Sequence, residues 1–447
     1  MKMGKRWFVG LALLLLLGFA VVGCSSSDSS TEDTPDATNT NETEEAPPAT
    51  EGEEVSLEIF QFKVEFKDQF EALAKTYEEE NPNVNINITT VGGGQDYGVA
   101  LRAKFASGDE PDIYNVGGPQ DVEDWIDSLA DLSDTESASL ALDGTLEGVS
   151  RDGQILGLPY NQEGYGLIYN KRVFEEAGID PSSITTLASL EEAVKTLDEK
   201  KEELGLDAVF ALPAAETWVT GLHLSNAFIA PEFNNDVIAA FEASQLEFKY
   251  SDAMKKVLDL QNDYSVQPVV SLDYSRQVEE LFSLERVALI QQGNWVYNSI
   301  ADMDPELAQD GIGILPIPVE GFKEDAIPVG VPMYWAVNKN SDDAKIAAAK
   351  EFLDWLYTSE IGKQTVVEDF KFIPAYEGYD SSKISDPLAK EIYQYAQEGR
   401  TIGWTFMGYP SSWGQDVLGV AIQKYLSDGQ SWDDLVEEVK TAWEEAR

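Results

Sequence analysis

Residues 55–90 read VSLEIFQFKVEFKDQFEALAKTYEEENPNVNINITT, and the spacing of their apolar side chains changes twice along this stretch. Apolar residues alternate over 55–62, which predicts a strand because successive strand side chains point to opposite faces. Over 66–77 they recur every three or four residues, which predicts one buried face of a helix. The sequence Asn-Pro-Asn at 81–83 ends that helix, and alternation over 84–88 predicts a second strand.

The same succession of elements continues beyond this stretch. Residues 101–106 have a helical pattern, and the sequence PDIY at 111–114 is typical of a short buried strand. A chain that alternates strands and helices forms a mostly parallel sheet with helices on both faces. Ligands of such sheets bind beyond the carboxyl ends of the strands, so the loops at 61–65, 94–98 and 115–120 are candidate ligand-facing segments.

The composition is strongly acidic. The chain has 447 residues, of which 81 are Asp or Glu and 31 are Lys or Arg, so its formal net charge is −50. Such a charge repels phosphate backbones and anionic lipid headgroups, which excludes a nucleic-acid binder or a polybasic membrane-surface protein. Hydrophobic residues make up 43% of the chain, a globular composition, and the length predicts about two or three domains. The acidic surface suits saline or alkaline surroundings, and no Asp cluster has the spacing of a calcium loop.

Only one cysteine, Cys24, and one histidine, His223, are present. The chain therefore lacks the residues for an intramolecular disulfide, a Cys-ligated zinc or a His-clustered metal site. The glycine-rich sequence at 92–97 also fails both phosphate-binding motifs, since Tyr97 stands where the dinucleotide fingerprint requires its third glycine. We therefore expect no metal and no cofactor.

The N-terminus has the features of a lipoprotein signal peptide. Three basic residues precede an apolar stretch over 7–22, which is shorter than the about 20 residues that a membrane-spanning helix needs. The sequence VVGC at 21–24 resembles the lipobox of bacterial lipoproteins, which implies a signal peptide at 1–23 and lipidation of Cys24. Residues 24–54 are rich in Ser, Thr, Pro and acidic residues, which predicts a disordered acidic tether. The alternative is an uncleaved anchor with an incidental cysteine.

Several short motifs follow one another over residues 55–447. They are FASGDEPDI at 105–113, GLPY at 157–160, LIYNK at 167–171, QGNW at 292–295, the segment 330–338 and FIPA at 372–375. In this order the motifs resemble those of the extracellular solute-binding proteins that supply carbohydrate ABC transporters. That family includes the maltose-binding and the raffinose-type multiple-sugar-binding proteins.

The resemblance implies an α/β, two-lobed periplasmic-binding-protein-like fold with discontinuous lobes and a ligand cleft at the hinge. Lobe one would comprise residues 55–162 with 334–372, and lobe two would comprise residues 166–330 with 376–447. The chain would cross between the lobes near residues 162–166, 330–335 and 373–376.

The resemblance also implies a function. The protein would capture a neutral sugar or oligosaccharide between its lobes and deliver it to the permease subunits of an ABC importer. It would be a monomer, held by the lipid on Cys24 at the extracellular face of the cytoplasmic membrane, and not an enzyme. A surface glycosidase with paired carboxylates is the alternative from another class. A further alternative keeps the fold and binds a polyamine, iron or glycerol phosphate.

A sugar site requires particular side chains, because a pyranose ring has a weakly polar face and a rim of hydroxyl groups. Flat aromatic rings stack on the face, and planar amides or carboxylates bind the rim. By resemblance to the tryptophan-bearing loops of the family, we predict that Trp295 and Trp413 stack on the sugar. Trp335 and Trp404 are nearby candidates. For each tryptophan the alternative is that it fills the core.

Polar candidates lie at the first crossing and in the loops that follow strands. Glu163 interrupts an apolar segment at the position where the maltose-binding family has a sugar-contacting Glu, and its alternative role is a hinge salt bridge. The other polar candidates are Asn115, Asn294, Gln95, Asp96, Lys63 and Glu65. For Lys63 and Glu65 a surface ion pair is an equal alternative.

Overall fold

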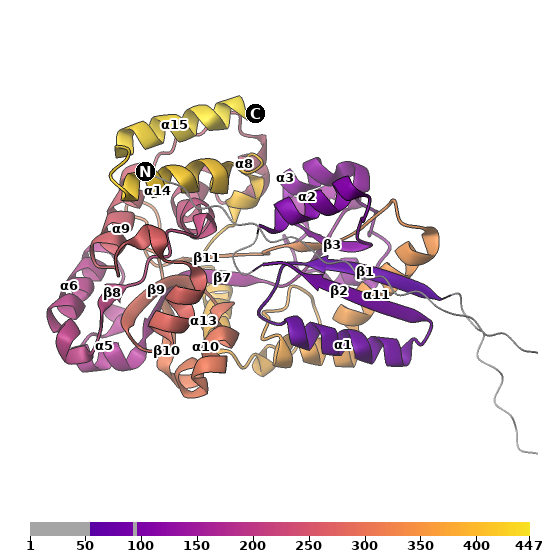
Figure 1. The fold of residues 1–447 in the computed structure, drawn as a ribbon, viewed down its shortest axis with the longest axis horizontal. Coiled ribbons are helices and arrows are strands. Elements are labelled where there is room, and N and C mark those ends of the chain that lie inside the picture. The colour runs from indigo at the N-terminus through magenta and orange to yellow at the C-terminus, as the bar shows by residue number, and fades with distance from the viewer. Residues whose placement is uncertain (1–53, 93–95) are drawn as a thin grey trace, which may run out of the picture. The chain divides into compact units, whose positions relative to one another are not determined.

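The computed structural model describes residues 54–92 and 96–447, which belong to one compact unit (Figure 1). The predicted signal peptide, Cys24 and all of the predicted tether except Glu54 lie outside the described residues, as does Gln95. Among the described residues, no helix combines the length and the apolar composition that a bilayer crossing requires.

The first of two main sheets confirms the predicted order of strands and helices. Its strands follow the spatial order β2-β1-β3-β12-β6. The first three strands are parallel, and β12 runs antiparallel to both of its neighbours. The strand bounds are β1 (Val55–Gln61), β2 (Val84–Thr90), β3 (Ile113–Val116), β6 (Leu158–Pro159) and β12 (Tyr334–Val337).

Helices cover both faces of this sheet because the strands send apolar side chains to both. Leu57 and Ile59 of β1 pack in one core with α1 (Lys67–Glu80) and α11 (Asp343–Thr358). Phe60 packs in a separate core with Leu101 of α2 (Tyr97–Ser107). Figure 1 shows α1 and α2 on opposite sides of β1 and β3. The expected α/β layering is therefore present.

The second sheet is built around β7 (Glu163–Asn170), which is buried along its whole length. The spatial order is β13-β11-β7-β9-β8, and β10 also pairs with β7. The strand bounds are β8 (Ala208–Phe210), β9 (Val287–Gly293), β10 (Ile312–Leu315), β11 (Ile327–Gly330) and β13 (Thr401–Ile402). A separate pair is formed by β4 (Ser150–Arg151) and β5 (Gln154–Ile155).

The remaining helices complete the layers. They are α3 (Pro119–Trp125), α4 (Glu136–Leu140), α5 (Lys171–Ala177), α6 (Leu187–Leu204), α7 (Ser225–Ile229), α8 (Val237–Glu242), α9 (Ser251–Asp263), α10 (Val296–Met303), α12 (Glu360–Gln364), α13 (Pro387–Gln397), α14 (Val420–Leu426) and α15 (Trp432–Glu445). Short π-helical segments adjoin several of them. Two of these, η4 (Val219–Leu224) and η12 (Trp413–Gly419), pack against each other in lobe two.

The chain passes between the two sheets more than once. It leaves the first sheet after β6 and enters the second at β7, and it returns between β11 and β12. We call the first sheet with the elements packed on it lobe one, and the second sheet with its elements lobe two. The bounds of the lobes given above remain a prediction.

The segment predicted to be the third crossing, residues 373–376, pairs with the first crossing and with lobe one. Ile373 forms a β-bridge with Gln162 at the first crossing. Tyr376 still pairs with Ala141 in lobe one, and the amide of Glu377 donates to Leu140 O at 2.7 Å. The bounds of this third crossing, like those of the lobes, remain a prediction.

Candidate ligand-binding cleft

A narrow pocket lies where elements of both lobes meet. It has about 280 Å³ of empty space. Its lining comes from the loop after β1, the start of β7, the segment from β9 into α10 and the segment before the last passage between the sheets. These residues are Lys63, Glu65, Phe66, Glu163, Asn294, Trp295, Tyr297, Asn298, Phe370, Lys371 and Phe372. Five predicted site residues thus line one pocket.

Strand ends bring these residues together. Lys63 follows the carboxyl end of β1, and Asn294 and Trp295 follow the carboxyl end of β9. Asn294 fixes its loop to the start of β7. Its side-chain Oδ1 accepts from the backbone amide of Gly164 at 3.1 Å, and its own backbone amide donates to Gly164 O at 3.2 Å. This position matches the general rule that open α/β sheets bind ligands beyond their strand ends.

The polar half of the pocket is a buried ion cluster of Lys63, Glu65 and Glu163. Lys63 Nζ contacts Glu163 Oε1 directly and lies 3.3 Å from Glu65 Oε1. Lys63 and Glu163 are almost inaccessible to solvent, since only 2% of Lys63 and 3% of Glu163 is exposed. The alternative role of Glu163, a salt bridge, is therefore present in the structure. This salt bridge is buried, and its partner, Lys63, is also a predicted site residue.

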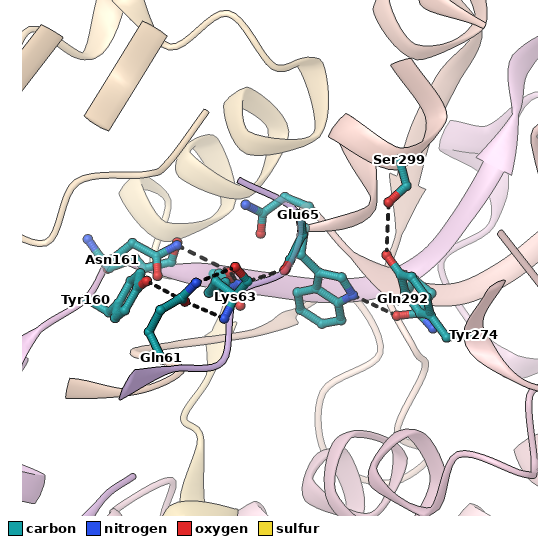
Figure 2. A network of polar contacts seen from close by, with 12 residues as sticks. Gln61, Lys63, Glu65, Tyr160, Asn161, Tyr274, Gln292 and Ser299 are labelled. Atoms are coloured by element: carbon teal, nitrogen blue, oxygen red, sulfur yellow. Dashed lines mark hydrogen bonds and ion pairs between the residues drawn. The ribbon is translucent and has the colours of Figure 1, made fainter. Parts of the chain in front are cut away.

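A second layer of hydrogen bonds holds this cluster in place (Figure 2). The amide of Lys63 donates to Gln61 Oε1 at 2.6 Å, and Tyr160 OH donates to the same oxygen at 3.2 Å. Asn161 Nδ2 donates to Glu163 Oε1 at 3.3 Å. The carboxylate of Glu163 is thus fixed by residues of both the first strand and the hinge, as expected of a preorganised binding group.

Burial and ion pairing change the pKa of Glu163 in opposite directions. Removal from water raises the pKa of the Glu163 carboxyl, and the adjacent Lys63 ammonium opposes this rise. A buried ion pair repays its desolvation only in part, so this pair is weak as a source of stability.

The other half of the pocket is aromatic. Trp295 is partly exposed, and its indole N–H donates to Gln292 Oε1 at 2.8 Å. The ring folds back over Gly293, where a Cβ atom would come within 2.2 Å of it, so only glycine fits at that position. Tyr274, whose hydroxyl lies 3.5 Å from Ser299 Oγ, lies close by in Figure 2.

An aromatic wall packs behind Trp295, and sequence reasoning missed most of it. We define this wall as Tyr165, Trp218, His223, Trp295 and Trp404, of which Trp295 lines the pocket. The ring centroids of His223 and Trp295 are 5.1 Å apart, and those of Trp218 and Trp295 are 6.2 Å apart. Trp404, a predicted candidate, lies 5.6 Å from both His223 and Tyr165. The wall joins segments that are distant in the sequence, and no local motif marks Trp218 or His223.

Several buried polar atoms near the strand ends and in the wall have no partner within the described part of the chain. Both amide atoms of Asn115, which is 1% exposed at the end of β3, are unpaired. The same holds for Asn161 Oδ1, Tyr165 OH and Trp404 Nε1. Buried polar groups are almost always hydrogen-bonded, so these atoms indicate partners supplied from outside the chain.

Three predicted site residues lie elsewhere. Trp413 is 1% exposed in the core of lobe two, and Trp335 is 1% exposed in the core of lobe one, where it stacks on Tyr160 at 4.3 Å. Both therefore fill the core, which was their alternative role. Asp96 is exposed and caps α2 by accepting from Val99 N at 2.8 Å. Gln95 lies outside the described residues.

Two further features bear on the site. Within residues 54–92 and 96–447, no group of three or more His, Cys, Asp or Glu side chains is arranged to hold a metal ion. A wider hollow of about 800 Å³ lies between α9 and α15, and its lining includes Ser251, Trp432 and Lys440. It contains no predicted site residue, so the pocket between the lobes remains the candidate site.

Two α/β lobes with a cleft at their crossings define a solute-binding protein of the bacterial transport type. Residues 63–363 match the bacterial extracellular solute-binding protein family, and the chain belongs to that family. Membership in a transport-binding family, rather than a family of enzymes, agrees with the function implied by the sequence motifs.

Relatives and solved structures extend this comparison. The melibiose/raffinose/stachyose-binding protein MelE of Bacillus subtilis (strain 168) is 22% identical over 393 residues, which cover 85% of this chain and 87% of MelE. The multiple sugar-binding protein of Streptococcus mutans is 22% identical over 320 residues, covering 67% of this chain and 68% of that protein. Among solved structures, a chitin oligosaccharide binding protein has a TM-score of 0.74 at 23% identity and covers 88% of this chain and 99% of its own. RafE in complex with raffinose has a TM-score of 0.71 at 20% identity, with the same coverage of 88% and 99%.

Proposed function

We propose that this protein captures a neutral sugar or oligosaccharide between its two lobes and delivers it to an ABC importer. The observation that carries the proposal is the pairing, in one cleft, of partly exposed aromatic rings with a buried, fixed carboxylate. Trp295 supplies a face for the apolar side of a pyranose ring, and Glu163 supplies oxygens for its hydroxyl groups. The sugars bound by MelE and RafE, as their names and complexes state, support the same ligand class.

The charges of the cleft favour a neutral ligand over the alternatives. The pocket is lined by two lysines, Lys63 and Lys371, and two carboxylates, Glu65 and Glu163, so its charges cancel and none is in surplus for a phosphate group. Both carboxylates already contact the ammonium group of Lys63, which leaves neither of them unpaired for a polyamine. A glycosidase requires an acid and a base that act separately, whereas Glu65 and Glu163 both contact one ammonium group.

Calorimetric titration against a panel of solutes tests this proposal. The panel contains melibiose, raffinose, stachyose and a chitin oligosaccharide, with spermidine and glycerol phosphate as controls. We expect at least one sugar to bind, to raise the melting temperature and to compact the protein in small-angle scattering, because a ligand that contacts both lobes stabilises the closed form. Chromatography should recover the sugar intact. Binding of a control alone, or hydrolysis of the sugar, would contradict the proposal.

We also propose that the protein works as a monomer tethered to the outer face of the cytoplasmic membrane by a lipid on Cys24. The motif VVGC at 21–24 and the polar composition of 24–54 support this anchor. Two acyl chains are sufficient for stable membrane attachment. Replacing Cys24 by Ala should therefore leave an uncleaved precursor without lipid, which labelling with a fatty-acid analogue and cell fractionation would detect. Equal labelling and cleavage of the Cys24→Ala variant and the unaltered protein would refute the anchor.

A further inference from the structure

The only histidine of the chain lies in the aromatic wall. His223 belongs to the π-helical segment η4, a rare conformation that is frequent at functional sites. The segment is held in place by η12, because Gly221 lies so close to it that a Cβ atom would come within 2.0 Å of Gly414 O. The backbone that carries His223 is therefore fixed by contact between two glycines.

Aromatic rings surround the imidazole and fix its orientation. Tyr165 stacks on it, with ring centroids 4.5 Å apart and planes inclined by 12°. The rings of Trp295, Trp218, Phe406 and Trp404 follow at 5.1, 5.2, 5.4 and 5.6 Å. Since Tyr165 covers one face of the imidazole, the edge with the two nitrogens is the part left for polar contacts.

Those nitrogens make no hydrogen bond within residues 54–92 and 96–447. The side chain of His223 remains partly exposed. The indole N–H of Trp404, beside His223, also has no partner among the described residues. A group of polar atoms set among apolar rings, none with a partner, is the arrangement expected of a site that a ligand completes.

We propose that His223 contacts the bound sugar and contributes to specificity, with one ring nitrogen donating to a sugar hydroxyl and the other accepting from one. This inference rests on the proposed function and names a residue that packs directly against Trp295 of the pocket lining. A neutral imidazole offers one donor and one acceptor, which matches hydroxyl groups because each of these can both donate and accept. It offers no charge to attract phosphate and no carboxylate to bind an amine.

The charge state of His223 supports this role. Burial among the surrounding rings and the positive charge of Lys63 together lower the pKa of His223 to about 3. The groups packed on the imidazole are the uncharged rings named above, and Lys63 is the charged group that acts on it. The imidazole therefore stays neutral from pH 5.5 to 8, and its donor and acceptor remain available over that range.

Nuclear magnetic resonance of the imidazole nitrogens tests the contact directly. Without an affinity tag the chain has one histidine, so the signals need no assignment. We expect saturation with raffinose, or with chitin oligosaccharide as the second probe, to shift these signals, and we expect the affinity to vary less than about twofold from pH 5.5 to 8. Sugar binding with unchanged imidazole signals would overturn the role of His223 and leave the proposed function intact. Failure of every sugar to bind would overturn both.

Two variants separate contact from packing. His223→Phe keeps an aromatic ring and removes both nitrogens, and it should weaken binding of the same sugar by about 10-fold to 100-fold, the usual effect of one or two lost hydrogen bonds. His223→Gln keeps a neutral donor and acceptor and should retain more of the affinity than His223→Phe. The melting temperatures of the unliganded variants provide the control. Wild-type affinity in His223→Phe, or no advantage of Gln over Phe, would show that the residue only fills space.

Discussion

Replacing Trp295 by alanine is expected to weaken sugar binding by about 30-fold to 1,000-fold, because central aromatic residues of binding sites typically contribute about 2 to 4 kcal/mol. The indole lines the pocket and is partly exposed, so its free face is available to a pyranose ring. Its loss also removes the donor to Gln292 Oε1, and Gln292 is 1% exposed. An unpaired buried acceptor costs about 1 to 3 kcal/mol, so the melting temperature of the unliganded protein should fall modestly while the variant stays folded.

Calorimetric titration and thermal melting of the Trp295→Ala variant together show whether Trp295 binds the sugar or supports the fold. Trp295→Phe is the matched control, since it keeps a stacking ring and loses only the indole N–H and part of the area. It should fall between the wild type and the alanine variant in affinity. An alanine variant that binds normally, or one whose weaker binding follows entirely from a lower melting temperature, would remove Trp295 from the site.

Local periodicity was enough to predict the first half of lobe one. The alternation over 55–62 and the helical spacing over 66–77 correspond to β1 and α1, because both depend on which side chains of one short segment face the core. The parallel pairing of β1 with β2 and β3 follows from the intervening helices. The two-lobed arrangement could not be derived in this way, since it depends on strands far apart in the chain, and it came from the family resemblance.

Which tryptophans face the ligand could not be predicted from local pattern. Trp335 lies on β12, where successive side chains point to opposite faces, and it packs in a different core from its neighbours Tyr334 and Ala336. Because both faces of this sheet are covered by apolar residues, alternation does not reveal which one the tryptophan occupies. Trp218 and His223 were missed for a related reason, since η4 has neither the helical nor the strand period.

The burial of Lys63 could not be predicted from the sequence either. A lysine in the loop after a strand, with a glutamate two residues later, is typical of a solvated surface pair. In the structure it is enclosed because β7, which begins about a hundred residues later, brings Glu163 into contact with it. Tertiary contacts of this separation leave no local signal, although the identities of both residues were predicted as part of the site.

Replacing Trp413 by alanine is expected to lower the free energy of unfolding by about 3 to 5 kcal/mol, the usual cost of truncating a buried tryptophan. The indole is 1% exposed and its N–H donates to Val439 O at 2.9 Å. Its ring packs edge to face against Tyr409 at 5.3 Å and Trp443 at 4.9 Å. The substitution removes these contacts together and leaves Val439 O without its donor, in a core that cannot fully collapse.

This variant should therefore show the reverse of the pattern expected for Trp295→Ala. Denaturant unfolding should give a large loss of stability, whereas titration at a temperature where the variant remains folded should give nearly wild-type affinity. Trp413→Phe should recover part of the stability, because a smaller ring still fills most of the space. A stable Trp413→Ala variant with greatly weakened sugar binding would instead place Trp413 at the ligand, as the family resemblance first implied, and would require a liganded conformation in which this part of lobe two rearranges.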